Sequence, residues 1–167
     1  MAEKLVTRMA VFIMIRDDQG RLLLQQRANT GYMDGYYDFA CSGHVDEGET
    51  IIEAAVRELK EEIGITAKAE DLKLVHINQN YLDRAYANFT FELRAWEGEP
   101  TICEPDKCSD LAYFAPDNLP EKCTLGVRVN ERAGFSSELG YSKVTPDNYE
   151  QYMGEGSLAS FLRDQGV

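Results

Sequence analysis

The stretch TIIEAAVRELKEEIGI, residues 50–65, is the clearest local structure that the sequence predicts. Thr50 followed by Glu53 has the Ser/Thr-x-x-Glu spacing of a capping box, which marks the start of a helix. Gly64 stands just past the periodic residues, where glycine readily forms a left-handed helix cap. The sequence therefore predicts a helix over residues 50–63. At about 100° per residue, one apolar stripe of this helix would pack on a sheet. Its members are Ile52, Ala55, Val56, Leu59 and Ile63.

Three glutamates, Glu58, Glu61 and Glu62, fall together on the face next to this stripe. Like charges one turn apart destabilise an isolated helix by roughly 0.2–0.5 kcal/mol per pair. A solvated acidic surface tolerates that cost, whereas a bound divalent cation would turn the repulsion into shared attraction to one centre. Ligands made only of carboxylates suit Mg²⁺, Mn²⁺ or Ca²⁺ rather than zinc. The helix alone does not decide between these two interpretations.

The residues that precede the helix favour the cation. From Gly43, five residues lead to Glu49, seven more lead to Arg57, and the glutamates follow directly. This stretch, GHVDEGETIIEAAVRELKEEIGI over residues 43–65, closely resembles the Nudix box of the Nudix (MutT-type) hydrolases. Every fixed position of that signature is filled, including the aliphatic residues Leu59 and Ile65. A proline and a glycine often precede Gly43 in the family, and this chain has Cys41 and Ser42 there instead.

The resemblance implies an α/β fold, namely an α/β/α sandwich around a mixed sheet. It also implies a divalent metal cofactor, Mg²⁺ or Mn²⁺. Carried over position by position, Glu58 and Glu62 would be the principal metal ligands, with Glu61 binding directly or through water. A backbone carbonyl at Ser42 or Gly43 would complete the set.

The same resemblance implies that Glu49 and Arg57 pair to hold the loop against the helix. An ordinary surface ion pair is the alternative, and it predicts a much milder effect of mutation. The expected catalytic set is Glu61, Glu62, Glu104, Arg57 and Glu49.

Glu104 enters this set as the general base or as an additional metal ligand. The segment WEGEP, residues 96–100, and the four residues after it resemble the corresponding strand and loop of MutT-type members, with Glu104 at the base position. Glu99 and Asp106 are close competitors, and an exposed loop carboxylate is the alternative role for Glu104. As the base, Glu104 would lie within reach of the attacking water.

Substrate contacts are expected from two other segments. Tyr32, Asp34 and Tyr36 lie on the glycine- and tyrosine-rich loop before the box, and Asn80 lies on a later strand. Aromatic rings can stack on a nucleobase, although loop tyrosines more often simply pack.

Apolar patterning predicts five strands, over residues 6–16, 21–27, 72–82, 85–96 and 111–115, with the first two joined as a hairpin. A second amphipathic helix should start at Thr145 and run towards Leu162, interrupted by Gly154 and Gly156. We expect a Nudix hydrolase domain over residues 1–120, with residues 121–167 forming a C-terminal extension packed on the same domain.

The net charge of −12 argues against nucleic-acid polymers and anionic membranes as partners. A nucleotide remains compatible with this charge when divalent cations bridge it to the protein. The four cysteines show no zinc spacing, and the N-terminus lacks an apolar signal region. We therefore expect a cytoplasmic protein, and the sheet edge leaves room for a homodimer.

The expected function is a metal-dependent pyrophosphohydrolase that uses water to cleave a (modified) nucleoside triphosphate to monophosphate and pyrophosphate. Hydrolysis of ADP-ribose or of a dinucleoside polyphosphate is the enzymatic alternative. A nucleotide-sensing module without turnover is the non-enzymatic alternative. Retention of Glu58, Glu61 and Glu62 favours catalysis, because a sensor does not need to activate water.

Overall fold

Two β-sheets organise the chain in the computed structural model, which describes residues 1–166. The larger sheet has five strands in the order β4-β1-β6-β5-β8, and the smaller sheet has three in the order β3-β2-β7. The strands are β1 (Arg8–Ile15), β2 (Leu22–Arg27), β3 (Tyr37–Phe39), β4 (Cys41–His44), β5 (Lys73–Tyr81), β6 (Ala85–Leu93), β7 (Cys108–Phe114) and β8 (Gly140–Val144). The helices are α1 (Ile51–Ile63), the 3-10 turn η1 (Ala69–Asp71), α2 (Leu125–Arg132), α3 (Tyr149–Met153) and α4 (Ser157–Asp164).

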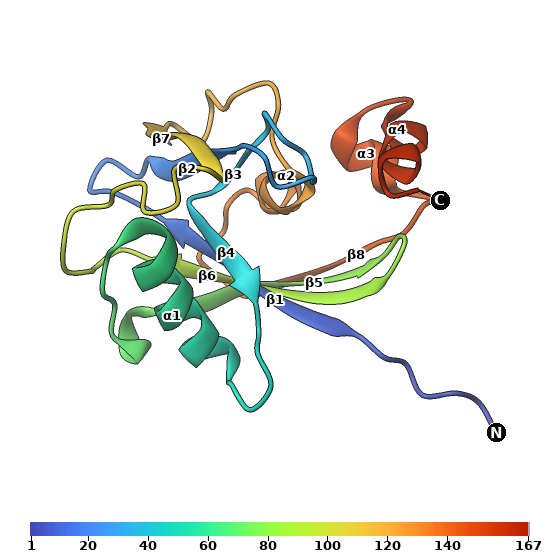
Figure 1. Ribbon diagram of the computed structural model, residues 1–167, viewed down its shortest axis with the longest axis horizontal. Coiled ribbons are helices and arrows are strands. Elements are labelled where there is room, and N and C mark those ends of the chain that lie inside the picture. The colour runs from blue at the N-terminus through green and yellow to red at the C-terminus, as the bar shows by residue number, and fades with distance from the viewer. Residues whose placement is uncertain (167) are drawn as a thin grey trace.

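The five-stranded sheet is mixed and has helices on both faces. Strand β1 is parallel to β6 and β5 is parallel to β8, whereas the β1–β4 and β5–β6 pairs are antiparallel. Figure 1 shows α1 on one side of this sheet, with α2, the smaller sheet and the α3–α4 pair on the other side. The predicted α/β/α arrangement around a mixed sheet is confirmed.

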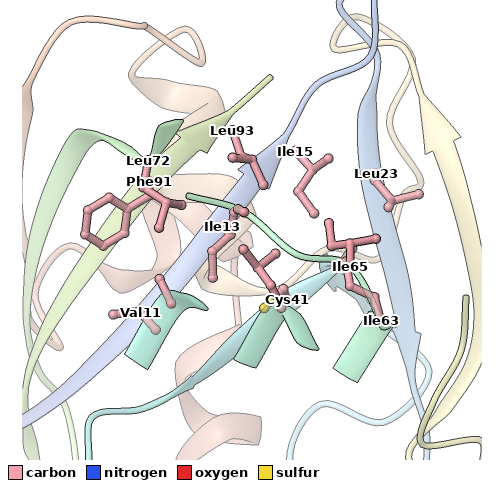
Figure 2. Packing of buried hydrophobic residues seen from close by; sticks show 14 of the residues in the cluster. Val11, Ile13, Ile15, Leu23, Cys41, Ile63, Ile65, Leu72, Phe91 and Leu93 are labelled. Atoms are coloured by element: carbon pink, nitrogen blue, oxygen red, sulfur yellow. The ribbon is translucent and has the colours of Figure 1, made fainter. Parts of the chain in front are cut away.

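The main core lies between the large sheet and α1. Val11, Ile13 and Ile15 alternate along β1 towards this side and pack with Phe91 and Leu93 of β6 (Figure 2). Met14, on the opposite face of β1, is buried in a second cluster. Cys41 is fully buried in the same cluster, and burial raises the pKa of its thiol well above the usual value. Cys41 is therefore a small core residue rather than an activated nucleophile.

Helix α1 has the predicted ends. The side-chain oxygen of Thr50 accepts a hydrogen bond from the backbone N–H of Glu53, the Glu53 carboxylate accepts one from the N–H of Thr50, and Gly64 caps the helix at φ 72°. The predicted stripe needs a correction, because Ile52 is 36% exposed while Ala54 is fully buried. The face of α1 that begins at Ala54 and continues through Glu58 and Glu62 lies against β4. These glutamates are described below.

The predicted hairpin of residues 6–16 and 21–27 is wrong. Strand β1 joins the large sheet and β2 the small one, and between them stands only an isolated bridge from Arg16 to Leu22 in the described chain. A turn at Asp17–Gly20 does connect the two strands. Both strands contribute to the same two clusters: Ile15 and Leu23 belong to one, and Met14 and Leu22 belong to the other.

The segment after residue 120 contributes more than the predicted helix. Strand β8 extends the large sheet by pairing with β5, and α2 packs beside β3; the sequence patterns predicted neither element. The helix expected from Thr145 towards Leu162 is divided into α3 and α4 by Gly154, at φ 95°, and Gly156, at φ 78°. The boundary at residue 120 stays a prediction. Over residues 1–166, no helix is long and apolar enough to cross a membrane.

Candidate active site

Arg57 ties the loop before α1 to the helix itself. Its Nε atom donates to Glu49 Oε1 at 2.7 Å, and its Nη2 atom donates to Glu49 Oε2 at 3.0 Å and to the carbonyl of His44 at 3.0 Å. This two-pronged contact uses the planar fork of the guanidinium, which a lysine lacks. The hydrogen bonds from Arg57 lower the pKa of Glu49 to about 2. The structure thus brings Glu49 and Arg57 together as expected.

The same guanidinium reaches the glutamate cluster. Arg57 Nη1 donates to Glu58 Oε1 at 2.8 Å and to Glu61 Oε2 at 3.2 Å. Glu61 remains largely exposed, with 57% of its side chain accessible, whereas the Glu58 side chain is 12% accessible. Burial raises the pKa of Glu58 despite the favourable contact with Arg57.

Gly43 on β4 allows Glu58 to occupy this position. A Cβ atom at residue 43 would collide with the Glu58 carboxylate, and the clash involves its Oε1, Cδ and Cγ atoms. The requirement for glycine is therefore one of space. The backbone of β4 and the glutamate row of α1 lie in direct contact because residue 43 has no side chain.

Glu62 is the most deeply buried carboxylate of the cluster. Its Oε2 atom accepts a hydrogen bond from the backbone N–H of Ser42 at 3.1 Å. In the described part of the chain no cationic side chain forms an ion pair with it. Burial, reinforced by the neighbouring charges of Glu58 and Glu104, raises the pKa of Glu62 to about 8. Glu62 is therefore a buried carboxyl group that has acidic neighbours and, among the described residues, no counter-ion.

Glu104 and Glu62 both line a cavity of about 430 Å³. Glu104 forms an ion pair with Lys107 at 3.2 Å, and both residues border this cavity. Of the three carboxylates considered for the base, Glu104 lies on the cavity wall; within residues 1–166, Glu99 and Asp106 do not. The walls comprise Gln25, Arg27, Asn29, Thr30, Ser42, Gly43, His44, Glu62, Glu104, Lys107 and Cys108. We call this space the acidic cavity.

The carboxylates of Glu58, Glu61 and Glu62 are the type of ligand that binds a divalent cation. Among residues 1–166, no three His, Cys, Asp or Glu side chains already converge on one point, because Arg57 draws Glu58 and Glu61 towards itself. The oxygen-only donors and the buried Glu62 carboxyl group, which has no ion-pair partner among the described residues and lies close to Glu58, nevertheless suit a hard cation. Such an ion would supply the missing positive charge beside Ser42 and Gly43.

A second pocket of about 320 Å³ adjoins the acidic cavity and shares Arg27, Ser42, Gly43 and His44 with it. Tyr32 and Asn80, both predicted to contact substrate, line this second pocket. We call it the inner pocket.

Asp34 and Tyr36 lie elsewhere. The Asp34 carboxylate accepts hydrogen bonds from the backbone N–H groups of Thr30 at 2.9 Å and Gly31 at 3.1 Å, so it closes its own loop. The contacts with Thr30 lower the pKa of Asp34. The Tyr36 ring lies below the Lys122 ammonium group, 5.9 Å from it. The structure does not bring these two residues to the inner pocket.

Three inner-pocket residues escaped the sequence patterns. Asp38 is buried in β3, where it accepts from Thr124 Oγ1 at 2.9 Å and lies 3.5 Å from Arg27. In the sequence, Asp38 is the one charged residue of the short apolar segment 38–41. That charge was the feature that could have marked it as a pocket residue. Asn88 on β6 and Phe161 on α4 carried no local signal, because strand pairing and the folding of the C-terminal segment bring them here.

Comparisons with known proteins agree with this geometry. The model of the NUDIX domain matches residues 6–132. The 8-oxo-dGTP diphosphatase of Escherichia coli (strain K12) is 32% identical over 108 residues, which cover 64% of this chain and 82% of that enzyme. A crystal structure of a MutT NUDIX hydrolase from Burkholderia pseudomallei superposes with a TM-score of 0.69 at 28% identity, covering 76% of this chain and 97% of that one.

The chain therefore belongs to the NUDIX domain family and is a Nudix hydrolase. Members of this family generally use a divalent metal ion. The isopentenyl-diphosphate Delta-isomerase of Serratia proteamaculans (strain 568) is 45% identical, but only over 64 residues. That match covers 38% of this chain and spans 36% of the isomerase, so it does not extend to the inner pocket as a whole.

Proposed function

We propose that this Nudix hydrolase is a divalent-metal-dependent pyrophosphohydrolase of nucleotides, acting on a (modified) nucleoside triphosphate to give a monophosphate and pyrophosphate. The observation that carries this proposal is the continuity of two spaces. The acidic cavity and the inner pocket meet at Ser42, Gly43 and His44. A ligand with phosphates at one end and a base at the other fits this pair of spaces.

The metal ligands that we propose are Glu58 and Glu62, with Glu61 joining directly or through water and a backbone carbonyl at Ser42 or Gly43. Bound there, Mg²⁺ or Mn²⁺ would neutralise the phosphates, activate water and stabilise the charge that develops at phosphorus. Without the cation, the carboxyl groups of Glu58 and Glu62 would offer a pyrophosphate group no positive charge to bind.

Side chains of the cavity wall would bind the phosphates and accept the proton of the attacking water. Arg27 and Lys107 both border the acidic cavity and can donate to phosphate oxygens. Glu104 would accept the proton of the attacking water, and its 3.2 Å contact with Lys107 holds the carboxylate in position. Arg57 and Glu49 would act by fixing the loop and helix that carry these groups.

The same geometry accommodates a larger diphosphate-linked substrate, so the test is a panel with product identification. Nucleoside triphosphates, modified triphosphates, ADP-ribose and dinucleoside polyphosphates are incubated with the full chain, with and without Mg²⁺ or Mn²⁺. We expect monophosphate and pyrophosphate from a triphosphate, and loss of the reaction on chelation. Release of AMP from ADP-ribose or a dinucleoside polyphosphate alone would reassign the substrate. Nucleotide binding without any release would identify a sensing module.

We propose no nucleic-acid polymer as a partner, because a net charge of −12 repels a phosphate backbone at long range. Cytoplasmic location and a homodimer stay predictions.

A further inference from the structure

Arg27 borders both the acidic cavity and the inner pocket. It is the last residue of β2, and the pairing of β2 with β7 shifts its register between Gln26 and Arg27. Register shifts of the β-bulge type are common next to active sites, where they redirect a side chain. The Arg27 side chain is 18% accessible, so most of it is enclosed by its neighbours. What surrounds the guanidinium group therefore decides how it can meet a ligand.

The loop that follows β2 holds the guanidinium group from one side. Arg27 Nε donates to the carbonyl oxygen of Tyr32 at 2.7 Å, and Arg27 Nη2 donates to Thr30 Oγ1 at 3.0 Å. The Arg27 Cζ atom also lies 5.3 Å from the centroid of the Tyr32 ring, within the range of a cation–π contact. These hydrogen bonds use Nε–H and one N–H of Nη2, so further N–H groups of Nη1 and Nη2 are left for other acceptors.

Asp38 provides a further, buried contact for the same group. Its Oδ2 atom forms an ion pair with Arg27 Nη1 at 3.5 Å, and the residue is only 2% exposed. Its Oδ1 atom accepts hydrogen bonds from Thr124 Oγ1 at 2.9 Å and from the backbone N–H of Phe39 at 2.8 Å. Each carboxylate oxygen thus has its own partners. The oxygen bonded to Thr124 and Phe39 anchors the carboxylate, and the other oxygen faces Arg27.

The start of α2 fixes the position of Asp38. Thr124 is the residue that caps the N-terminus of α2, and its backbone N–H donates to the carbonyl oxygen of Tyr37 at 2.9 Å. This contact joins α2 to β3, the strand that carries Asp38. Burial raises the pKa of Asp38, whereas the contacts with Arg27 and Thr124 act in the opposite direction. The positive end of the helix dipole also favours a carboxylate here.

We propose that Asp38 is a positioning residue that acts through Arg27, and that it holds the guanidinium group where its free N–H groups meet phosphate oxygens of the substrate. The inference rests on the proposed function, because it takes the acidic cavity as the phosphate end. A side chain that is already fixed loses less conformational freedom on binding, and a small displacement of such a group is costly. The charge of Asp38 also offsets part of the attraction between Arg27 and a phosphate. Positioning and charge therefore predict opposite results when that charge is removed.

The test uses inorganic tripolyphosphate with Mg²⁺, which presents phosphates without a sugar or a base, and calorimetry on the full chain. Asp38→Asn keeps an oxygen that can accept from Thr124, but it places an N–H donor opposite Arg27. We expect it to weaken tripolyphosphate binding by about tenfold. Thr124→Val removes the anchoring hydroxyl group without changing any charge and should weaken binding in the same direction. It takes the place of Asp38→Asn if melting curves show that Asp38→Asn does not fold.

A double-mutant cycle separates positioning from a general structural effect. Arg27→Lys keeps the charge but loses the planar fork, so it should also weaken tripolyphosphate binding by about tenfold. Adding Asp38→Asn or Thr124→Val to Arg27→Lys should cause no further loss, because the two residues act through the guanidinium group. Additive losses would overturn the proposal, as would tighter binding by Asp38→Asn or an unchanged affinity in Arg27→Lys.

Asp110→Asn is the matched control. The Asp110 carboxylate accepts a hydrogen bond from Tyr37 Oη at 2.6 Å, and within residues 1–166 it borders neither the acidic cavity nor the inner pocket. This variant should bind tripolyphosphate as the wild-type chain does. Weaker binding of nucleoside triphosphates by Asp38→Asn with unchanged tripolyphosphate binding would show that Asp38 contacts the nucleoside directly, and would overturn the proposal.

Binding and turnover distinguish this inference from the proposed function. If no triphosphate is hydrolysed but the cycle between residues 38 and 27 shows the expected coupling, the proposed hydrolysis fails and the positioning role stands. If triphosphates are hydrolysed but Asp38→Asn matches the wild-type chain in tripolyphosphate binding and in kcat/KM, the hydrolysis stands and the positioning role fails.

Discussion

Gly43 and Glu58 are in such close contact that residue 43 has no room for a side chain. The glutamate carboxylate occupies the space where a Cβ atom would lie. A glycine on a short strand and a glutamate on the helix that follows thus form one structural unit.

The first prediction follows from this contact. Gly43→Ala should displace the Glu58 carboxylate and lower kcat/KM on the order of a hundredfold, because catalytic groups tolerate little displacement. Gly134→Ala is the comparison, since Gly134 has a φ of 71° and nothing near it. That variant should lose stability by about 1 kcal/mol with little change in kcat/KM. Equal activities of the two variants in a steady-state assay would contradict the account.

The second prediction concerns acid stability. The pKa of Glu49 is lowered in the folded chain, to about 2, by its hydrogen bonds with Arg57. A lowered folded-state pKa means that the contribution is fully present above the unfolded value, near 4.3, and is lost as the pH falls towards 2. Denaturant titrations at several pH values should therefore show a smaller acid-induced loss of stability over this window in Glu49→Gln than in the wild-type chain. Parallel curves would show that the pair makes no such contribution.

The third prediction identifies the general base. Glu104→Gln should lower kcat by roughly 10²–10⁴-fold, which is the usual contribution of a positioned base. Glu99→Gln and Asp106→Asn are matched controls from the same loop and should stay near the wild-type rate. If one of the controls shows the loss and Glu104→Gln does not, the base lies at that other position.

The fourth prediction concerns the wall supplied by the C-terminal segment. The Phe161 ring packs against Tyr149, with centroids 5.4 Å apart, and lines the inner pocket. Phe161→Leu keeps an apolar side chain, so it should cost less than about 1.5 kcal/mol of stability. It should raise KM for the nucleotide more than it lowers kcat. A change confined to kcat would show that α4 does not contact the substrate.

Local spacing accounts for what the sequence predicted well. The capping residues Thr50 and Glu53, and the run from Gly43 to Ile65, depend on neighbours along one helix and one loop, so their geometry is encoded within a few turns. Glu62 and Glu104 come from separate segments, and only the resemblance to a known family connected them before the structure placed both at the acidic cavity.

Long-range packing accounts for what the sequence did not predict. The burial of Asp38, the free oxygens of Asn80 and Asn88, and the position of Phe161 depend on strand register and on the way residues 121–166 fold back. Asp34 is of a residue type that often binds ligands, but its carboxylate accepts hydrogen bonds from the backbone of its own loop. Residue type alone could not separate it from Tyr32, which lies two positions earlier and reaches the pocket.

The most direct test of the central claim is the rate of divalent-metal-dependent nucleotide hydrolysis by Glu62→Gln, compared with Glu70→Gln at an exposed site. Glutamine keeps the size of the side chain and an oxygen that can accept from Ser42, but removes the charge that would hold the cation. We expect Glu62→Gln to lose the activity while its melting temperature stays at or above the wild-type value, and Glu70→Gln to match the wild-type chain in both. Undiminished metal-dependent turnover by Glu62→Gln would contradict the assignment of the glutamate row as the metal site.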